Sequence, residues 1–185
     1  MNEYQILLDV VRQTFASVVW THKIQEKQAD IYNERYAFIE TINIVIVSIT
    51  ACGIVSLIFT DQMWVKIAAS LLSLATVAIS IYDKTFHLHD LGTQHKISAN
   101  KLLLIRNELL QIISDIHIHK ESMEDINKRY QELKIKLNKI YSEMPTTTNN
   151  AVERASLALK TKEEFTYSEE EIDRFLPPTL KGRVK

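Results

Sequence analysis

The chain has 185 residues, of which 46% are hydrophobic and 24% are charged, and its formal net charge is -1. This length fits one domain of ordinary size, and the balanced charge argues against direct nucleic-acid binding, which needs a basic surface. The single cysteine excludes an intrachain disulfide and a cysteine-based zinc site, and the spacing of the three glycines fits neither the dinucleotide-binding fingerprint nor the Walker pattern.

Residues 1–40 are predicted to form an amphipathic helix. Its seam residues recur at alternating spacings of four and three, the pattern of a helix that packs one face against a partner. These residues are Tyr4, Leu8, Val11, Phe15, Val18 and His22. No proline or glycine interrupts the chain before the next segment, so the helix is expected to continue into it.

Two apolar runs follow, at residues 41–59 and 64–82. Between Thr41 and Tyr82 the only charged residues are Asp61 and Lys66. Each run has 19 residues, and at about 1.5 Å rise per residue such a helix nearly spans the roughly 30 Å hydrocarbon core of a bilayer. The runs therefore predict two transmembrane helices joined by a short external turn at residues 60–63.

The flanks of the second run support this interpretation. Lys66 is its third residue, from which a lysine side chain can reach the headgroups, and Trp64 and Tyr82 bracket the run as interfacial aromatic residues do. The alternative is a helical hairpin buried in a soluble bundle, but a chain of this size hardly supplies a shell to enclose it. We therefore expect the lipid bilayer to surround the hairpin.

The distribution of lysine and arginine predicts the orientation of the two spans. Basic residues gather on the side of the termini, and only Lys66 lies near the connection. They are Lys23, Lys27 and Arg35 before the first span and Lys84, Lys96, Lys101 and Arg106 after the second. Because basic segments stay on the cytoplasmic side, both termini are expected in the cytoplasm.

Residues 83–144 are predicted to form a cytoplasmic helical hairpin with two apolar seams. The first seam comprises Leu102, Ile105, Leu109, Ile112 and Ile116, and the second comprises Met123, Ile126, Tyr130, Leu133, Leu137 and Ile140. Ser122 followed by Asp125 predicts a helix N-cap, so the chain is expected to turn near residues 119–121. With the N-terminal helix, this hairpin makes a three-helix bundle, within one chain or shared between protomers. Gly92 is the expected weak point between bundle and membrane.

Residues 145–185 are predicted to form a linker and short C-terminal helices. Pro145 and the following TTTNN break the helical pattern, and AVERASLALK is typical of a short helix. Ser168 and Glu171 predict a capping box before EEIDRF, and the prolines after it end that helix. The acidic residues of this tail are expected to form a solvated face rather than a binding patch.

No catalytic, cofactor or metal site is predicted. His87 and His89, like His117 and His119, are two residues apart, so on a helix the members of each pair point about 200° apart and cannot close on one metal ion. No serine lies in a G-x-S-x-G nucleophile elbow. We therefore expect no cofactor and interpret the chain as something other than an enzyme.

The informative polar residues lie inside the predicted spans. They are Asn43, Ser48, Cys52, Ser56, Ser70, Ser73, Thr76 and Ser80. Small residues at helical spacing let helices approach closely, so the favoured interpretation is that one stripe on each span faces the other within a hairpin. The sharper hypothesis is that some of these residues line a polar path when several hairpins assemble.

The layout resembles the SLATT family of two-transmembrane effector domains. The resemblance rests on VVWTHKIQEKQADIY before the first span, MWVKIAASLLSLATVAISIYDKTF, HKISANKLLLIRNELLQIISDI and EEIDRFLPPTL, and it covers nearly all of the chain. It implies an all-α membrane protein, a two-helix transmembrane hairpin with a cytoplasmic amphipathic bundle, in the inner membrane of a bacterium.

The resemblance also implies a function in bacterial defence. Members of the family occur beside nucleotide second-messenger synthases, SLOG-type sensors or reverse transcriptases. This implies an antiviral, abortive-infection effector that oligomerises into a pore or disrupts the membrane when a cytoplasmic signal arrives. The signal would come from a nucleotide second messenger, its synthase or a reverse-transcriptase partner, although the chain contains no recognisable nucleotide-binding module. The alternative is a non-conducting membrane anchor that docks a partner protein through its bundle.

Overall fold

The structure is a computed structural model that describes residues 3–56, 62–177 and 181, with the backbone alone at Ser56. Throughout this part of the chain the regular structure is helical, without a strand. Six helices follow in order: α1 Glu3–Ser56, α2 Met63–Phe86, α3 Leu88–His117, α4 Met123–Glu143, α5 Asn149–Lys160 and α6 Glu169–Phe175. The predicted all-α fold is therefore confirmed.

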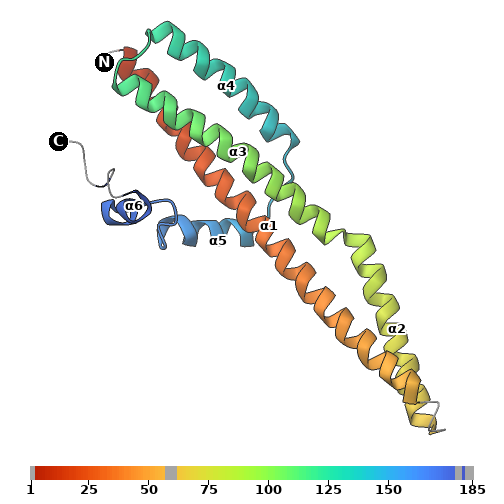
Figure 1. The fold of residues 1–185 in the computed structure, drawn as a ribbon. Coiled ribbons are helices and arrows are strands. Elements are labelled where there is room, and N and C mark those ends of the chain that lie inside the picture. Colours follow the sequence, from red (N-terminus) through yellow and green to blue (C-terminus); the bar gives the residue numbers. More distant parts are fainter. Residues whose placement is uncertain (1–2, 57–61, 178–180, 182–185) are drawn as a thin grey trace.

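The architecture is set by one very long helix. α1 has 54 residues and runs the whole length of the molecule, beside α3 in one half and beside α2 in the other (Figure 1). Its continuity follows from the sequence, which has no proline in this segment and no glycine before Gly53. The predicted N-terminal helix and the predicted first span are thus parts of one rigid rod.

The second long arm of the hairpin is broken at one residue. His87 separates α2 from α3 and has the left-handed conformation, with φ 46° and ψ 45°. The expectation that Gly92 would be the weak point was wrong. Gly92 lies inside α3 and is buried, because its missing side chain lets α3 approach Asn33 of α1.

The hairpin formed by α1 and α2 has the properties of a membrane-spanning pair. α1 and the α2–α3 arm each contain an 18-residue stretch apolar enough to cross a membrane, and almost all side chains of the two spans lie outside any protein core. A helix whose apolar face is covered by nothing else belongs in lipid. Of the predicted external turn, residues 60 and 61 lie outside the described part, and α2 begins at Met63.

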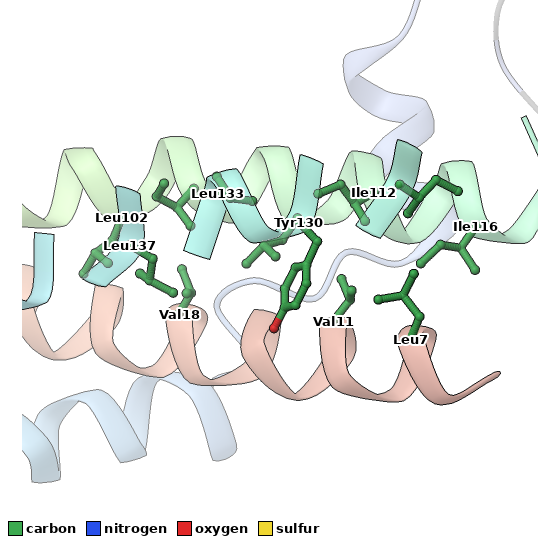
Figure 2. Packing of buried hydrophobic residues seen from close by; sticks show 12 residues of the cluster. Leu7, Val11, Val18, Leu102, Ile112, Ile116, Tyr130, Leu133 and Leu137 are labelled. Atoms are coloured by element: carbon green, nitrogen blue, oxygen red, sulfur yellow. The ribbon is translucent and has the colours of Figure 1, made fainter. Parts of the chain in front are cut away.

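Outside the spans, α1, α3 and α4 share one apolar core (Figure 2). α3 lies along α1 and α4 folds back over both, so that side chains of all three helices interdigitate. Twelve buried residues make this core: Leu7, Val11, Val18, Leu102, Ile105, Leu109, Ile112, Ile116, Ile126, Tyr130, Leu133 and Leu137. Ile140 packs against them while partly buried.

The turn between α3 and α4 is fixed by polar contacts. The hydroxyl of Ser122 accepts a hydrogen bond from the Asp125 backbone N–H, as the predicted N-cap requires. Arg129 on α4 donates to the buried carboxylate of Asp115 on α3 at 2.9 Å and to Glu121 in the turn at 2.8 Å. The hydrogen bond from Arg129, together with one from Gln111, lowers the pKa of Asp115, because both stabilise its charged form.

The C-terminal segment returns to α1 between the bundle and the membrane. α5 lies across α1 (Figure 1) and buries Ala151 and Ala155 against Ile24 and Ile31. The predicted capping box of Ser168 and Glu171 begins α6. The apolar side chains of α6 are exposed, Phe175 to 82%.

Candidate functional site

A buried polar layer separates the apolar core of the bundle from the spans. We define it as His22, Lys23, Gln25 and Gln28 of α1 with His95 and Ser98 of α3. In the apolar core α1 and α3 meet through residues such as Val18 and Leu102, whereas here they meet largely through side chains that must be hydrogen-bonded. The cohesion of this layer therefore depends on specific partners.

Two glutamines on α1 supply several of these partners. The Oε1 atom of Gln25 lies 2.5 Å from His95 Nδ1 on α3, and its amide nitrogen donates to the Pro145 carbonyl at 3.1 Å. The Oε1 atom of Gln28 accepts from both the backbone N–H and the hydroxyl of Thr148, each at 2.8 Å. α1 thus anchors α3 and the linker before α5 at one level.

Lys23 is the most unusual member of the layer, because its side chain is only 4% exposed. Its Nζ atom donates to Glu26 at 2.7 Å on the same helix and to Glu164 at 2.9 Å in the C-terminal segment. The same ammonium lies 4.0 Å from the centre of the Phe165 ring. A buried lysine needs such compensation because an isolated buried charge is costly.

The Phe165 ring also contacts α3. The guanidinium of Arg106 lies 4.8 Å from the ring centre, and the His22 ring lies 5.6 Å from it in a tilted arrangement. Cations over an aromatic face are attracted by its negative charge density. We call Lys23, Arg106, Glu164 and Phe165 the Lys23 clamp, since through it the C-terminal segment bridges α1 and α3.

The electrostatics of the clamp favour its charged form. Burial by itself would lower the pKa of Lys23, but the hydrogen bonds to Glu26 and Glu164 outweigh it and raise that pKa above its ordinary value. The hydrogen bond from Lys23 lowers the pKa of Glu164. At neutral pH the pair is therefore an ion pair, and its two charges stabilise each other.

His22 lies beside the clamp in a different state. Burial, assisted by the positive charges of Arg106, Lys23 and Lys96, lowers its pKa although Glu26 opposes the shift. Its Nδ1 atom is buried without a hydrogen-bond partner among the described residues. A neutral imidazole is therefore the form that this environment accepts.

In the membrane hairpin the predicted polar residues divide between two environments. Ser48, Cys52, Ser70 and Ser73 are exposed, and of these only Ser73 lines the groove between the spans described below. The hydroxyls of Ser48 and Ser70 donate to the carbonyls four residues earlier on their own helices. Thr76 and Ser80 are half-buried, and the side chain of Ser56 lies outside the described part.

A groove of about 260 Å³ runs between the two spans. It is lined by Val47, Thr50, Ala51, Ile54, Ser73 and Thr76. Thr50 is buried here, and its hydroxyl is satisfied by the Ile46 carbonyl at 2.8 Å. Thus Thr50 rather than Ser48 faces the second span, and the stripe containing Ser48 and Cys52 points elsewhere.

Asn43, in the first span, has a side-chain oxygen that lacks a hydrogen bond within the described residues. Its Oδ1 atom is buried and has no hydrogen-bond partner among the described residues. At membrane depth an unsatisfied amide oxygen costs free energy, because no water is available to replace the partner.

The histidine pairs do not come together as ligands. His87 is the exposed break between α2 and α3, and His89 contacts Tyr36. His117 is exposed at the end of α3 and His119 packs edge-on against Tyr4. Over residues 3–56, 62–177 and 181, no three His, Cys, Asp or Glu side chains are close enough to hold a metal ion.

The clamp was not predicted from the sequence, although one signal was present. The seam of α1 continues past His22 at the same spacing into Gln25, so polar residues occupy positions where an apolar core would continue. That pattern indicates a buried polar layer. Its partners could not be deduced, because Glu164 lies 141 residues from Lys23.

The arrangement defines a membrane protein with a two-helix transmembrane hairpin and an extramembrane helical bundle. A model for the SMODS and SLOG-associating 2TM effector domain family 4 matches residues 7–171, and the chain belongs to this family. It is thus a two-transmembrane effector associated with SMODS and SLOG defence systems. No curated protein and no solved structure matches the chain significantly.

Proposed function

We propose that this effector assembles into a homo-oligomer that permeabilises the bacterial inner membrane when an infection signal reaches its bundle. Both termini and the bundle are then cytoplasmic, and the two spans of several copies surround the path that opens. The observation that carries this proposal is the exposure of Ser48, Cys52 and Ser70 on faces that the hairpin leaves uncovered.

The exposed hydroxyls suit both an isolated and an assembled hairpin. Because Ser48 and Ser70 bond to their own helix backbone, they are tolerated in lipid. In an assembly the same hydroxyls could meet water or a neighbouring helix. The unsatisfied Oδ1 of Asn43 supports assembly as well, since a second hairpin or a water path would supply the missing donor.

The long helices provide a direct route from signal to membrane. α1 is uninterrupted from the bundle through its span, so a rotation of its bundle half must reach the membrane half. The break at His87 lets the α2–α3 arm change its angle while α1 stays straight. The family description supports a partner of the SMODS or SLOG type, and we propose a nucleotide second messenger, its synthase or a reverse transcriptase as the source of the signal.

A second candidate is a non-conducting membrane anchor. It is favoured by the buried and half-buried polar residues of the hairpin, Thr50, Thr76 and Ser80, because their hydroxyls bond to the backbone of their own helices and need no second hairpin. In this function the bundle and α6 would dock a partner protein.

Substitutions on the two kinds of face distinguish the candidates. Ser48→Leu and Ser70→Leu add apolar volume on exposed faces, so they should leave the fold intact and reduce dye release from liposomes, since an apolar constriction resists wetting. Ser80→Leu is the matched control, because it should strain the contact with α1 and lower the yield of folded protein first.

Expression, oligomer size and dye release are measured on the same preparations, with and without the product of the neighbouring gene. Full leakage from a correctly assembled Ser48→Leu, Ser70→Leu protein would remove these serines from the path. If the wild-type protein releases no dye under any condition, the anchor is the better account.

A further inference from the structure

We propose that the segment containing Glu164 and Phe165 is an autoinhibitory strap, which holds α1 and α3 together at the polar layer and keeps the effector silent. This inference rests on the proposed function for its consequence, the leak. The contact itself stands on the geometry of the Lys23 clamp.

The strap binds at the polar layer, where few apolar contacts hold α1 and α3 together. Nearer the free end of the bundle, apolar side chains of α1, α3 and α4 hold the helices together. At the polar layer α4 has ended, and the buried residues there include the small Ala29 and Ala99. The α1–α3 contact includes Gln25 with His95, the stacked rings of Tyr32 and His95, and the close approach of Gly92. Polar contacts exchange with water at small net cost, so this level opens most easily.

The strap closes this level by binding both helices at once. Glu164 pairs with Lys23 of α1 at 2.9 Å, and the Phe165 ring contacts both that ammonium and the Arg106 guanidinium of α3. Lys27 adds a second cation at 3.7 Å from the Glu164 carboxylate. Loss of the strap would therefore remove a connection between α1 and α3, the two helices that lead into the spans.

The backbone of the strap is held in a strained turn. Glu163 has φ 50°, a left-handed conformation that a residue with a side chain rarely adopts. The turn is supported by the hydrogen bond from Glu164 N–H to the Ala158 carbonyl at 3.1 Å and by the clamp. When the clamp releases, the strain at Glu163 can relax. This relief stabilises the released form of the strap.

α6 is placed to work as the handle of the strap. Only Thr166 and Tyr167 separate Phe165 from Ser168, the N-cap of α6. Ile172 and Phe175 of α6 are exposed beside a run of acidic residues, so a partner can bind these two side chains without disturbing the core. A displacement of α6 is therefore transmitted directly to the clamp.

The first experiment measures the opening itself. In the full chain with Cys52→Ser, spin labels are placed at Arg35→Cys on α1 and Gln94→Cys on α3, both exposed positions near the polar layer. Glu164→Gln combined with Phe165→Ala should lengthen and broaden the distance between the labels. Glu163→Gln combined with Tyr167→Ala is the matched control, because it changes an exposed acidic and an exposed aromatic residue beside the clamp, and it should leave the distance unchanged.

The second experiment measures the consequence in liposomes. Phe165→Cys with Arg106→Cys removes the ring and should raise spontaneous dye release several-fold over the control. Joining the two thiols with a short bifunctional reagent should restore the silent state. Helicity and oligomer size are checked on each preparation, so that unfolding is not mistaken for opening.

The two experiments separate the strap from the pore. An unchanged label distance in the Glu164→Gln, Phe165→Ala protein, or a leak that crosslinking does not reduce, would overturn the strap. A longer distance with no dye release from any variant would leave the strap standing and overturn the proposed pore.

Discussion

Gly92 of α3 packs so closely on Asn33 of α1 that a Cβ atom at position 92 would lie 2.5 Å from Asn33 Oδ1 and 3.5 Å from Tyr32 Cβ. The first of these atoms ends a short side chain that is exposed and can turn aside, whereas the second is fixed to the helix. The contact therefore sets a limit on side-chain size between the polar layer and the spans.

Replacement of Gly92 should test this limit, because a small and a large side chain should change the free energy of unfolding in opposite directions. Gly92→Ala should be neutral or stabilising by up to about 1 kcal/mol, because alanine is the better helix former and Asn33 can rotate. Gly92→Leu should destabilise by about 1–3 kcal/mol, since it forces α3 away from Tyr32. Thermal unfolding in detergent measures both. Equal stability of the two variants would mean that the helices separate here at little cost.

Charge in the apolar core should break the bundle. Leu109 is buried and its neighbour Leu110 is 55% exposed, so the pair offers a matched comparison on one helix. Leu109→Asp should cost at least about 3 kcal/mol through lost apolar burial and a desolvated carboxylate, and Leu133→Asp should behave alike. Leu110→Asp should cost under about 1 kcal/mol. The free energy of unfolding and the helix content measured by circular dichroism report the difference. A similar loss in Leu110→Asp would contradict the assigned core.

The buried histidines predict a loss of stability in mild acid. Burial lowers the pKa of His22 and of His95 below the ordinary 6.5, so the unfolded chain binds more protons than the folded protein as the pH falls through this value. Stability should therefore be full above pH 6.5 and decline below it until the folded-state pKa values are passed. His22→Gln should flatten the decline, and the exposed His117→Gln should not. A pH series of unfolding temperatures tests this, and an unchanged slope in His22→Gln would contradict it.

The proposed orientation predicts a labelling pattern. In a Cys52→Ser background, a cysteine at Gln62, just before α2, should react with a membrane-impermeant thiol reagent from outside intact spheroplasts. A cysteine at Asn150, exposed in the first turn of α5, should react only after lysis. The reverse pattern would place the bundle outside the cell.

Much of the fold followed from the sequence because it depends on local rules. The near absence of charge between Thr41 and Tyr82 predicted the two-span hairpin, which the family assignment and the uncovered helices confirm. Capping chemistry predicted the starts of α4 and α6, since an N-cap needs only its own first turn. Helical periodicity predicted which residues share a face, and the structure places Leu102 and Leu133 in one core.

Tertiary structure alone decided which faces meet. Periodicity does not say whether Ser48 or Thr50 faces the second span, because that depends on how the helices are rotated about their axes. The break at His87 falls in a segment without proline, and the nearest glycine, Gly92, lies inside α3, so the residue types that usually mark a break did not locate it. Lys23 could be buried only because Glu164 and Phe165 return to it from the far end of the chain, and a partner 141 residues away is visible only once the chain has folded.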